Sequence, residues 1–273
     1  MNCPLNRLTL YLLPKRTLTA AVAAFARSSL SRFIIPWYIR HYDIDTSDAD
    51  LPVDAYGSLL GFFCRSLKAG SRPVETSSIV SPVDGVVSEM GRIQEGRLLQ
   101  AKGCTYSLQA LLGDDGLAMK FLNGSYLTLY LSPRDYHRIH MPVDGDIVRW
   151  KYIPGNLYPV NQSGVHSIPG LFTKNERLVT QIKMVSEEMA LVKVGATIVG
   201  SIRTIYGPVF TSTWSRRRRF PEVGITQQAI QKGSEIGRFE FGSTVILLFQ
   251  PGMSKTFSVQ HGERIRAGQA LVK

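Results

Sequence analysis

Two of the chain's five histidines fall in one short window, "SPRDYHRIHMP", which covers residues 132–142. His137 and His140 are three positions apart, and Asp135 lies just upstream. Imidazole titrates near neutral pH, so the window favours general acid–base chemistry. Two alternatives stay open: hydrogen-bonding core histidines, or an H-x-x-H metal pair that has no evident third ligand nearby. We expect no metal, and the prolines that bracket the window predict a short, turn-like segment.

Two aspartates are candidates to orient one of these histidines. Asp84 and Asp144 each occupy a Pro-Val-Asp-Gly turn, in "SPVDGVV" and "MPVDGDIV". A buried carboxylate can fix an imidazole tautomer and stabilise its cation. An Asp-Gly pair is also an ordinary turn signal, which by itself accounts for both residues. From the residues alone the choice between the two aspartates stays open.

A serine occupies an unusual place in "GRFEFGSTVILLF", residues 237–249. The segment reads as one buried strand, yet Gly242 and Ser243 stand in its middle. Glycine weakens a strand interior and marks a bulge or a close approach of another group. The pattern alone therefore predicts a bulge. No G-x-S-x-G, P-loop or strand-linked G-x-G-x-x-G is present, so the hydrolase, nucleotide and dinucleotide classes lack their signatures.

The elements that must position these residues are mostly strands. From Pro73 onward, short Val/Ile/Leu runs alternate with Gly, Pro and Asp turns. This grammar resembles the barrel-sandwich of lipoyl and biotinyl carrier domains. Val86 and Asp146 follow the two Asp-Gly turns, so neither turn offers a carrier lysine. We predict an α+β fold: a β-rich, barrel-sandwich-like core preceded by a helical N-terminal region.

The helical region has two predicted parts. Residues 1–42 are basic and broken by Pro14 and Pro36, and residues 55–70 predict a second helix that Gly70 closes. In the first part, one helical face gathers residues Leu18, Val22, Phe25, Ser29 and Phe33. A basic amphipathic helix with aromatic anchors favours a lipid interface. A helix packed on the protein's own core and a mitochondrial transit peptide are the alternatives.

The charge of the chain favours an anionic partner. The formal net charge is +11, residues 1–40 contain no acid, and Arg216–Arg219 form a basic run. Nucleic acid, an acidic membrane and a plain solvated surface all fit such an excess. No apolar stretch reaches 18 residues, so a spanning helix is not expected. Cys3, Cys64 and Cys104 are odd in number and far apart, which speaks against a disulfide framework or a zinc site.

Several separate motifs together resemble the phosphatidylserine decarboxylase family. They are "FFCRSLKAGSRP", "SPVDGVV", "YHRIHMPVDG", "VGATIVGSI" and "FGSTVILLFQPG", in the family's order and covering the chain from about Ala55 onward. The usual family signature is Leu-Gly-Ser-Thr, whereas this chain has Phe241 before Gly242. The Gly-Ser pair itself is intact.

The resemblance implies a self-made pyruvoyl cofactor. Ser243 would attack the carbonyl of Gly242 and convert the peptide bond into an ester. Loss of the Ser243 α-proton would then release Gly242 as a carboxylate, and hydrolysis of the resulting dehydroalanine would expel ammonia. The family pattern assigns the base to His140, oriented by Asp84. The products would be residues 1–242 (β chain) and 243–273 (α chain), held together as a heterodimer.

The resemblance also implies the turnover reaction. The amine of phosphatidylserine would form a Schiff base with the pyruvoyl group, and loss of CO₂ would yield phosphatidylethanolamine. His137 is the candidate that supports decarboxylation and reprotonation, and Asp135 is a weaker candidate to orient it. Residues 1–42 would be the membrane-associating segment and residues 43–273 the catalytic domain.

The expected location follows from a lipid substrate that stays in its bilayer. The chain resembles the bacterial form, peripheral on the cytoplasmic face of the inner membrane, with an anionic membrane surface but no nucleic acid as partner. A further homodimer is left open. Two rivals remain: a sibling decarboxylase for another serine lipid or a soluble amino acid, and a non-enzymatic membrane-associated β module.

Overall fold

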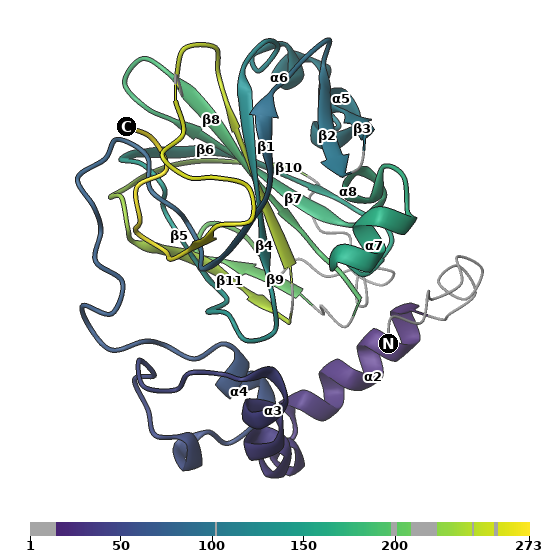
Figure 1. Ribbon diagram of the computed structural model, residues 1–273, viewed down its shortest axis with the longest axis vertical. Coiled ribbons are helices and arrows are strands. Elements are labelled where there is room, and N and C mark those ends of the chain that lie inside the picture. Colours follow the sequence, from purple (N-terminus) through teal and green to yellow (C-terminus); the bar gives the residue numbers. More distant parts are fainter. Residues whose placement is uncertain (1–14, 102, 198–200, 209–222, 242, 254–255) are drawn as a thin grey trace.

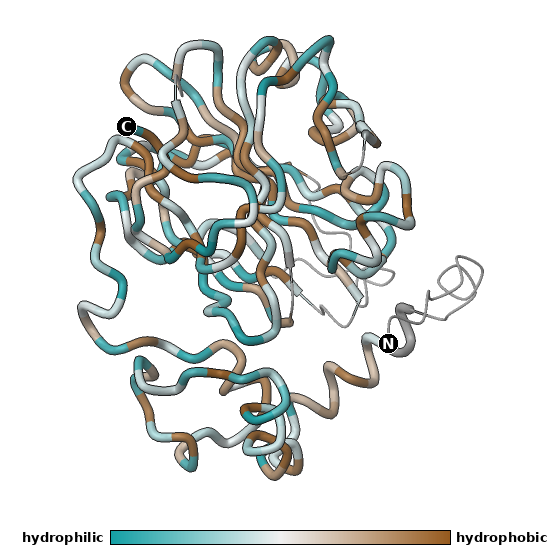
Figure 2. Tube along the Cα trace, in the orientation of Figure 1, coloured by the Kyte–Doolittle hydropathy of each residue, from teal (hydrophilic) through white to brown (hydrophobic). Residues whose placement is uncertain are grey.

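The computed structural model describes residues 15–101, 103–197, 201–208, 223–241, 243–253 and 256–273. Figure 1 shows a β-rich body with a group of helices from the N-terminal part of the chain below it. Most regular elements in these ranges are strands, and the predicted α+β class is confirmed. Along the tube in Figure 2, apolar residues recur through the strands at the centre of this body.

The body is organised around an eight-stranded sheet in which all neighbours are antiparallel. Its order is β10 (Val223–Ile230), β6 (Gly145–Ile153), β7 (Arg177–Lys183), β8 (Glu188–Val194), β12 (Ser243–Phe249), β4 (Ser125–Leu131), β1 (Gly85–Arg92) and β13 (Arg264–Ile265). The order ends at β10 and β13 without these two edges pairing. Within the described residues the sheet is therefore open, and the predicted barrel-like closure is not seen.

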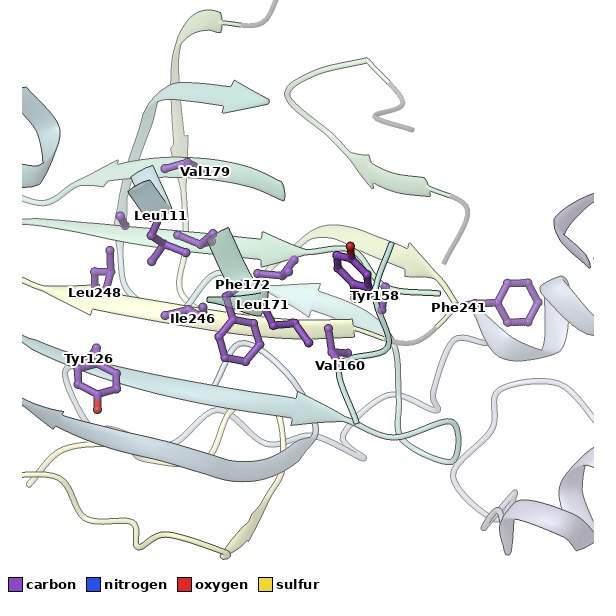
Figure 3. Packing of buried hydrophobic residues seen from close by; sticks show 14 of the residues in the cluster. Leu111, Tyr126, Tyr158, Val160, Leu171, Phe172, Val179, Phe241, Ile246 and Leu248 are labelled. Atoms are coloured by element: carbon purple, nitrogen blue, oxygen red, sulfur yellow. The ribbon is translucent and has the colours of Figure 1, made fainter. Parts of the chain in front are cut away.

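Two smaller sheets and two apolar layers complete the body. β5 (Arg138–His140), β11 (Glu235–Glu240) and β9 (Ser201–Thr204) form one sheet; β2 (Arg97–Ala101) and β3 (Cys104–Ser107) form the other. Alternate residues of β12 enter different apolar clusters, because successive side chains point to opposite faces. Val245 and Leu247 belong to one cluster. Ile246 and Leu248 belong to the other, part of which is drawn in Figure 3.

Both predicted Asp-Gly turns start strands, and both glycines are required there. β1 begins at Gly85 and β6 begins at Gly145. A Cβ on Gly85 would lie 2.5 Å from the carbonyl oxygen of Tyr130, and one on Gly145 would lie 2.5 Å from that of Lys183. The repeated motif therefore marks two places where a strand begins in close contact with its neighbour's backbone.

The N-terminal helices follow the prediction only in part. They are α2 (Lys15–Arg27), the 3₁₀ segment η1 (Ser29–Ile34), α3 (Ile35–Tyr42), η2 (Val53–Ala55) and α4 (Leu59–Phe63). Pro36 does not break a helix but lies in the first turn of α3, where its missing N–H costs no hydrogen bond. No helix in the described ranges is long and apolar enough to cross a membrane.

The predicted helix over residues 55–70 is wrong in extent. α4 ends at Phe63, and four consecutive residues, 62–65, are buried. A helix half-covered by protein cannot bury four successive side chains, so the chain leaves helical geometry and threads between neighbours. Gly70 does adopt a positive φ of 81°, but in a turn. Four short helices cover the body: α5 (Leu108–Leu112), α6 (Asp115–Met119), α7 (Gln162–Ser167) and α8 (Leu171–Lys174).

The segment predicted as one strand over residues 237–249 is two strands in different sheets. β11 ends at Glu240, and β12 begins at Ser243. Between them Phe241 has a φ of 80°, the left-handed region that bulky side chains rarely adopt. Gly242, where we predicted a bulge, lies outside the described residues. The chain thus changes sheet at the position where the sequence pattern showed only an awkward glycine.

Candidate active site

The candidate reacting segment lies where β11 passes into the centre of the large sheet. Ser243 is the first residue of β12 and pairs with Leu131 at the end of β4. Thr244 is paired on both sides, with Tyr130 and with Val194 of β8. The backbone after the Gly242–Ser243 bond is therefore fixed by two neighbouring strands. Phe241, which precedes this Gly-Ser pair, is in a strained conformation of a kind that clusters at functional sites.

The loop after β4 brings the histidine window to the same place. Ser132 follows Leu131, and its N–H and hydroxyl both donate to the carboxylate of Asp135, each over 2.7 Å. His137 Nε2 lies 3.0 Å from the carbonyl oxygen of Ser132 and donates to it. Arg264 binds the other oxygen of Asp135 at 2.5 Å. Asp135 and His137 are thus both anchored on Ser132, one residue beyond the partner of Ser243.

The N-terminal helices hold this loop from the outside. The hydroxyl of Tyr38 in α3 donates to the carbonyl of Pro133 over 3.3 Å. Arg65, two residues beyond α4, donates from Nη2 to the carbonyl of Arg134 over 3.2 Å. The helical region and the histidine window therefore form one structural unit.

His137 is fully buried, and its ring stacks on Phe63 with centroids 3.9 Å apart. Phe63 in turn contacts Phe241, with centroids 4.6 Å apart. In Figure 3, Phe241 lies apart from the other labelled cluster residues, at the end of its strand. Burial lowers the pKa of His137 to about 3; the charge of Arg65 acts in the same direction, and the bond to Ser132 acts against it. The ring is therefore neutral, and its Nδ1 has no partner among the described residues.

His140 is half-buried and has both ring nitrogens engaged. Nδ1 lies 2.7 Å from the carbonyl oxygen of Gly233, and that acceptor assigns the proton to Nδ1. Nε2 then accepts from the hydroxyl of Tyr136 at 3.0 Å. In register, His140 lies opposite Glu235, whereas the carbonyl of His137 accepts from the N–H of Phe239. Along β11, His137 is therefore nearer than His140 to the Gly242–Ser243 bond.

The two candidate aspartates have other partners than His140. Asp84 is held by Arg72 through Nε at 2.9 Å and Nη2 at 2.6 Å, and it accepts from the N–H of Ala267 at 2.8 Å. The guanidinium of Arg72 lies 6.0 Å from the ring centre of Tyr136, the residue that bonds His140. Asp84 thus reaches His140 through Arg72 and Tyr136.

Asp144 has a role in its turn. Its Oδ1 accepts from the N–H of Lys232 at 2.8 Å, which ties the start of β6 to the segment before β11. The orienting group at His140 Nδ1 is a backbone carbonyl. In the structure, then, neither aspartate is bonded to His140.

A pocket of about 410 Å³ adjoins the loop. Its lining is almost entirely charged: Asp43, Asp45, Asp48, Arg65, Leu67, Arg72, Asp84, Arg134, Asp135, Tyr136, Arg264, Ile265 and Arg266. No three His, Cys, Asp or Glu side chains in the described ranges gather as a metal site would require. Because charged side chains dominate its lining, the pocket is suited to a charged ligand, and Tyr136 and Asp135 in its wall are groups that could take part in proton transfer.

Sequence reasoning missed Phe63, Arg65, Arg72 and Tyr136 as residues of this region. Phe63, Arg65 and Arg72 lie in the motif "FFCRSLKAGSRP", and Tyr136 stands between the two residues Asp135 and His137 that were singled out. Their types gave no signal, because an apolar pair, scattered arginines and a tyrosine are common in any chain. Only their tertiary contacts distinguish them.

Comparison with known proteins identifies the family of the chain. Residues 59–273 match the family model described as phosphatidylserine decarboxylase. The chain is 46% identical over 264 residues to a phosphatidylserine decarboxylase proenzyme of Brevibacillus brevis, covering 95% of this chain and 94% of the relative. It is 43% identical over 282 residues to a protein of the same name from an Anaeromyxobacter species, with 99% of each chain covered.

A third relative is similar in extent. The phosphatidylserine decarboxylase proenzyme of Acidovorax ebreus is 42% identical over 268 residues, covering 96% of this chain and 94% of its own. The matched region contains the histidine window, the Asp84 turn and the Gly242–Ser243 bond. With such matches over nearly its whole length, the chain belongs to the phosphatidylserine decarboxylase family.

Proposed function

We propose that this protein decarboxylates phosphatidylserine to phosphatidylethanolamine, using a pyruvoyl group that it makes from Ser243 by cleaving the Gly242–Ser243 bond. One observation carries the proposal most directly. Ser243 opens the central strand β12 two residues after Phe241, whose backbone is left-handed, and beside a loop that holds two histidines. The names of the relatives, each a decarboxylase proenzyme, support it further.

The strained residue gives the cleavage a physical rationale. A bulky side chain at positive φ costs about 1–3 kcal/mol, which the surrounding structure must impose. Phe241 is held there because its ring is buried against Phe63 while β11 and β12 pair with different strands. Cleavage after Gly242 would free Phe241 from the constraint that β12 imposes. That release would favour the later step, in which loss of the Ser243 α-proton breaks the ester and separates the two chains.

His140 is the proposed base for self-cleavage. The pKa of His137, lowered to about 3, makes His137 a poor proton acceptor at neutral pH. His140 has its Nδ1 proton fixed by the carbonyl of Gly233, so its Nε2 carries the lone pair. The hydroxyl of Tyr136 occupies that lone pair and must turn away when the proton of Ser243 is taken. Asp84 supports this arrangement through Arg72.

The pyruvoyl group would supply a carbonyl that condenses with the serine amine and withdraws electrons as CO₂ leaves. The chain's own contribution is positional. His137 presents an unpartnered Nδ1 next to Phe63, close to the residue before the cleaved bond. Because the buried imidazole of His137 carries no charge, it can accept a hydrogen bond there without attracting the negative carboxylate of the substrate. We therefore retain His137 as the group that supports decarboxylation, with Asp135 holding the shared anchor, Ser132.

The N-terminal helices present an apolar surface that fits a lipid interface. α2 buries its small residues, Ala23 and Ala26, and packs against α4 and η1. Its Phe25 is 45% exposed; further exposed apolar side chains are Leu30, Phe33, Trp37 and Leu51. One face of α2 is thus covered by protein and the other is exposed, which is compatible with the proposed lipid contact. We propose that residues 1–42 attach the catalytic region, residues 43–273, to the cytoplasmic face of an anionic membrane. The predicted contact through Arg216–Arg219 lies outside the described residues.

Self-cleavage is tested by denaturing gel and intact mass on purified chain. We expect two pieces, residues 1–242 and 243–273, with the shorter one blocked at its N-terminus. Ser243→Ala should give one uncleaved band, whereas Ser88→Ala, a change in the neighbouring part of the sheet, should cleave normally. An active wild-type chain that stays whole with an ordinary Ser243 would overturn the proposal. Assays with phosphatidylserine, other serine lipids and free amino acids then separate the proposed substrate from those of a sibling enzyme.

A further inference from the structure

Arg65 is a buried cation whose guanidinium is only partly satisfied. Its residue is 5% exposed, and its Nη2 donates to the carbonyl of Arg134. Nε and Nη1 have no hydrogen-bond partner in the described part of the chain. The guanidinium carbon lies 5.1 Å from the ring centre of Phe62, so an aromatic face covers part of the group. Burial of an unpaired charge is costly, and it lowers the pKa of Arg65.

Three carboxylates that line the pocket are paired with other arginines, and a fourth, Asp45, feels the charge of Arg65 but accepts its hydrogen bond from the N–H of Ser47. Asp84 and Asp48 are bound by Arg72, and Asp135 is bound by Arg264. Arg65 lines the same pocket of about 410 Å³. A buried, under-satisfied guanidinium facing a charged pocket is a site that an anionic ligand would complete.

We propose that Arg65 binds the phosphodiester of the lipid headgroup. This inference rests on the proposed function and names the group that the pocket recognises. Phosphatidylserine offers two anions, the phosphodiester and the carboxylate. The carboxylate loses its charge as CO₂ departs, so a cation placed on it would stabilise the substrate more than the transition state. The phosphodiester keeps its charge throughout, and a guanidinium matches the geometry of its oxygens.

The position of Arg65 agrees with this assignment. Its charge acts on His137, so the two side chains are neighbours, and Phe63, two residues before Arg65, stacks on that histidine. The pocket is also lined by Asp135 and Tyr136, in the loop that follows the strand partner of Ser243. Another lining residue is Asp43, which directly follows α3, the helix with the exposed Trp37. A headgroup entering from the apolar helices would meet Arg65 before it reached Ser243.

The test is a kinetic comparison of Arg65→Gln with wild type, using phosphatidylserine in mixed detergent micelles. Uniform binding of a group that does not react lowers KM and leaves kcat unchanged. We expect KM to rise by about 10- to 100-fold, the range for a lost hydrogen bond to a charged group, with kcat within about threefold. Arg65→Lys should recover part of the loss. Arg92→Gln, which removes an exposed arginine of β1, is the matched control for net charge.

The product distinguishes the two anions. Phosphatidylethanolamine keeps the phosphodiester but lacks the carboxylate, so its inhibition constant should weaken in Arg65→Gln by the same factor as KM. If only phosphatidylserine binding weakens, Arg65 recognises the carboxylate and the proposal is wrong. A fall in kcat with unchanged KM would overturn it equally, because that result marks a group needed for the reaction step.

A wild-type measurement covers the case in which the Arg65 variants do not fold. Soluble glycerophosphoethanolamine should inhibit at least about tenfold better than ethanolamine, which has the amine but no phosphate. Equal inhibition would remove the basis for a phosphodiester site. Inorganic phosphate should inhibit less well than glycerophosphoethanolamine, and the reverse order would identify a general phosphate site instead of a headgroup site. Self-cleavage on a denaturing gel is scored separately, so failure of the pyruvoyl proposal is not confused with failure of this one.

Discussion

The guanidinium of Arg27 lies 2.5 Å from the carboxylate of Glu240, which joins the end of α2 to the end of β11. Glu240 is buried and also accepts from the hydroxyl of Ser201 and from Arg203. It stands two residues before Gly242. The helix with the proposed lipid-facing side chains is therefore tied directly to the segment that is proposed to break.

Glu240→Gln should destabilise the protein far more than Arg27→Ala. Burial opposes ionisation of Glu240, but hydrogen bonds from Ser201, Arg27 and Arg203 outweigh it and hold its pKa below the usual value. Loss of the carboxylate should cost about 1–3 kcal/mol of unfolding free energy, against at most about 1 kcal/mol for Arg27, which is 45% exposed. Urea unfolding in a Ser243→Ala background measures both. Equal losses would mean that the helix contact, and not burial of the carboxylate, dominates.

The carboxylate of Glu240 also predicts that the free energy of unfolding decreases at acid pH. A lowered folded pKa means that the stabilisation is complete above the unfolded value of about 4.3 and fades as pH falls through the folded pKa. In Glu240→Gln the free energy of unfolding should depend less on pH in this acid range.

Because of the buried amine of Lys193, the free energy of unfolding should increase as pH rises above neutrality. Its amine is fully buried in β8, and burial lowers its pKa to about 7. Between about pH 7 and the unfolded value of about 10.4, the unfolded chain binds a proton that the folded chain does not, so unfolding becomes less favourable as pH rises. Lys193→Met should remove this dependence and be the more stable protein at pH 7.

The environment of Lys193 makes that substitution a clean test. Its amine donates to the hydroxyls of Thr180 and Tyr206, which also bond each other over 2.7 Å. Both hydroxyls therefore keep a partner after the change. Lys183→Met, at an exposed position of β7, is the control, and thermal melts across pH 6–10 are the measurement. A Lys193→Met protein with the wild-type pH profile would contradict the buried-amine explanation.

Asp84 and Arg72 should behave as one unit in self-cleavage. Because Asp84 meets His140 only through Arg72 and Tyr136, removing either partner disturbs the same path. We expect Asp84→Asn and Arg72→Gln each to slow cleavage, and the double variant to be little slower than the worse single variant. Cleavage rates of the wild type, the two single variants and the double variant, measured after cell-free synthesis, complete the double-mutant cycle. Additive effects would instead indicate that Asp84 acts on His140 directly during the reaction.

The two histidines should separate cleavage from turnover. His140→Ala is expected to slow cleavage by roughly 100-fold or more, the contribution of a positioned base. His137→Ala should still cleave, but the processed enzyme should lose decarboxylation. Gel densitometry and CO₂ release measure the two steps. If His137→Ala blocks cleavage and His140→Ala does not, the two roles are exchanged. The position of His137, closer than His140 to the Gly242–Ser243 bond along β11, would then be the reason.

Membrane binding should depend on the exposed aromatic residues of the helical region. Phe33 and Trp37 are 71% and 51% exposed, and their burial in a lipid interface would supply most of the apolar contribution. Phe33→Ser with Trp37→Ser should reduce binding to anionic vesicles roughly tenfold or more in a sedimentation assay. Ile225→Ser is the control, because Ile225 is 85% exposed on the edge strand β10, outside the helical region of the chain. If Ile225→Ser weakens vesicle binding as much as the double variant does, binding is not localised to the helices.

Local patterns predicted much of the fold, and tertiary contacts decided the rest. The Pro-Val-Asp-Gly repeats predicted the starts of β1 and β6, because a turn followed by a strand is encoded in adjacent residues. The contact of Asp84 with Arg72 could not be predicted, since the aspartate's turn gives no sign of which side chain will approach it. The split between β11 and β12 was hidden for a similar reason. Apolar residues on both sides of Gly242 read as one strand, although they pair with different sheets.

The place of β12 in the sheet has a consequence for the proposed two-chain enzyme. β12 lies between β8 and β4, and the same proposed fragment supplies β13 and the bridge of Ala270 to Val80. Dissociation of the fragment 243–273 would therefore remove a central strand and split the large sheet into two parts. Cleavage would leave the native contacts in place but turn unfolding into a dissociation, so the melting temperature of the processed enzyme would rise with protein concentration. The uncleaved Ser243→Ala chain would melt at a temperature independent of concentration.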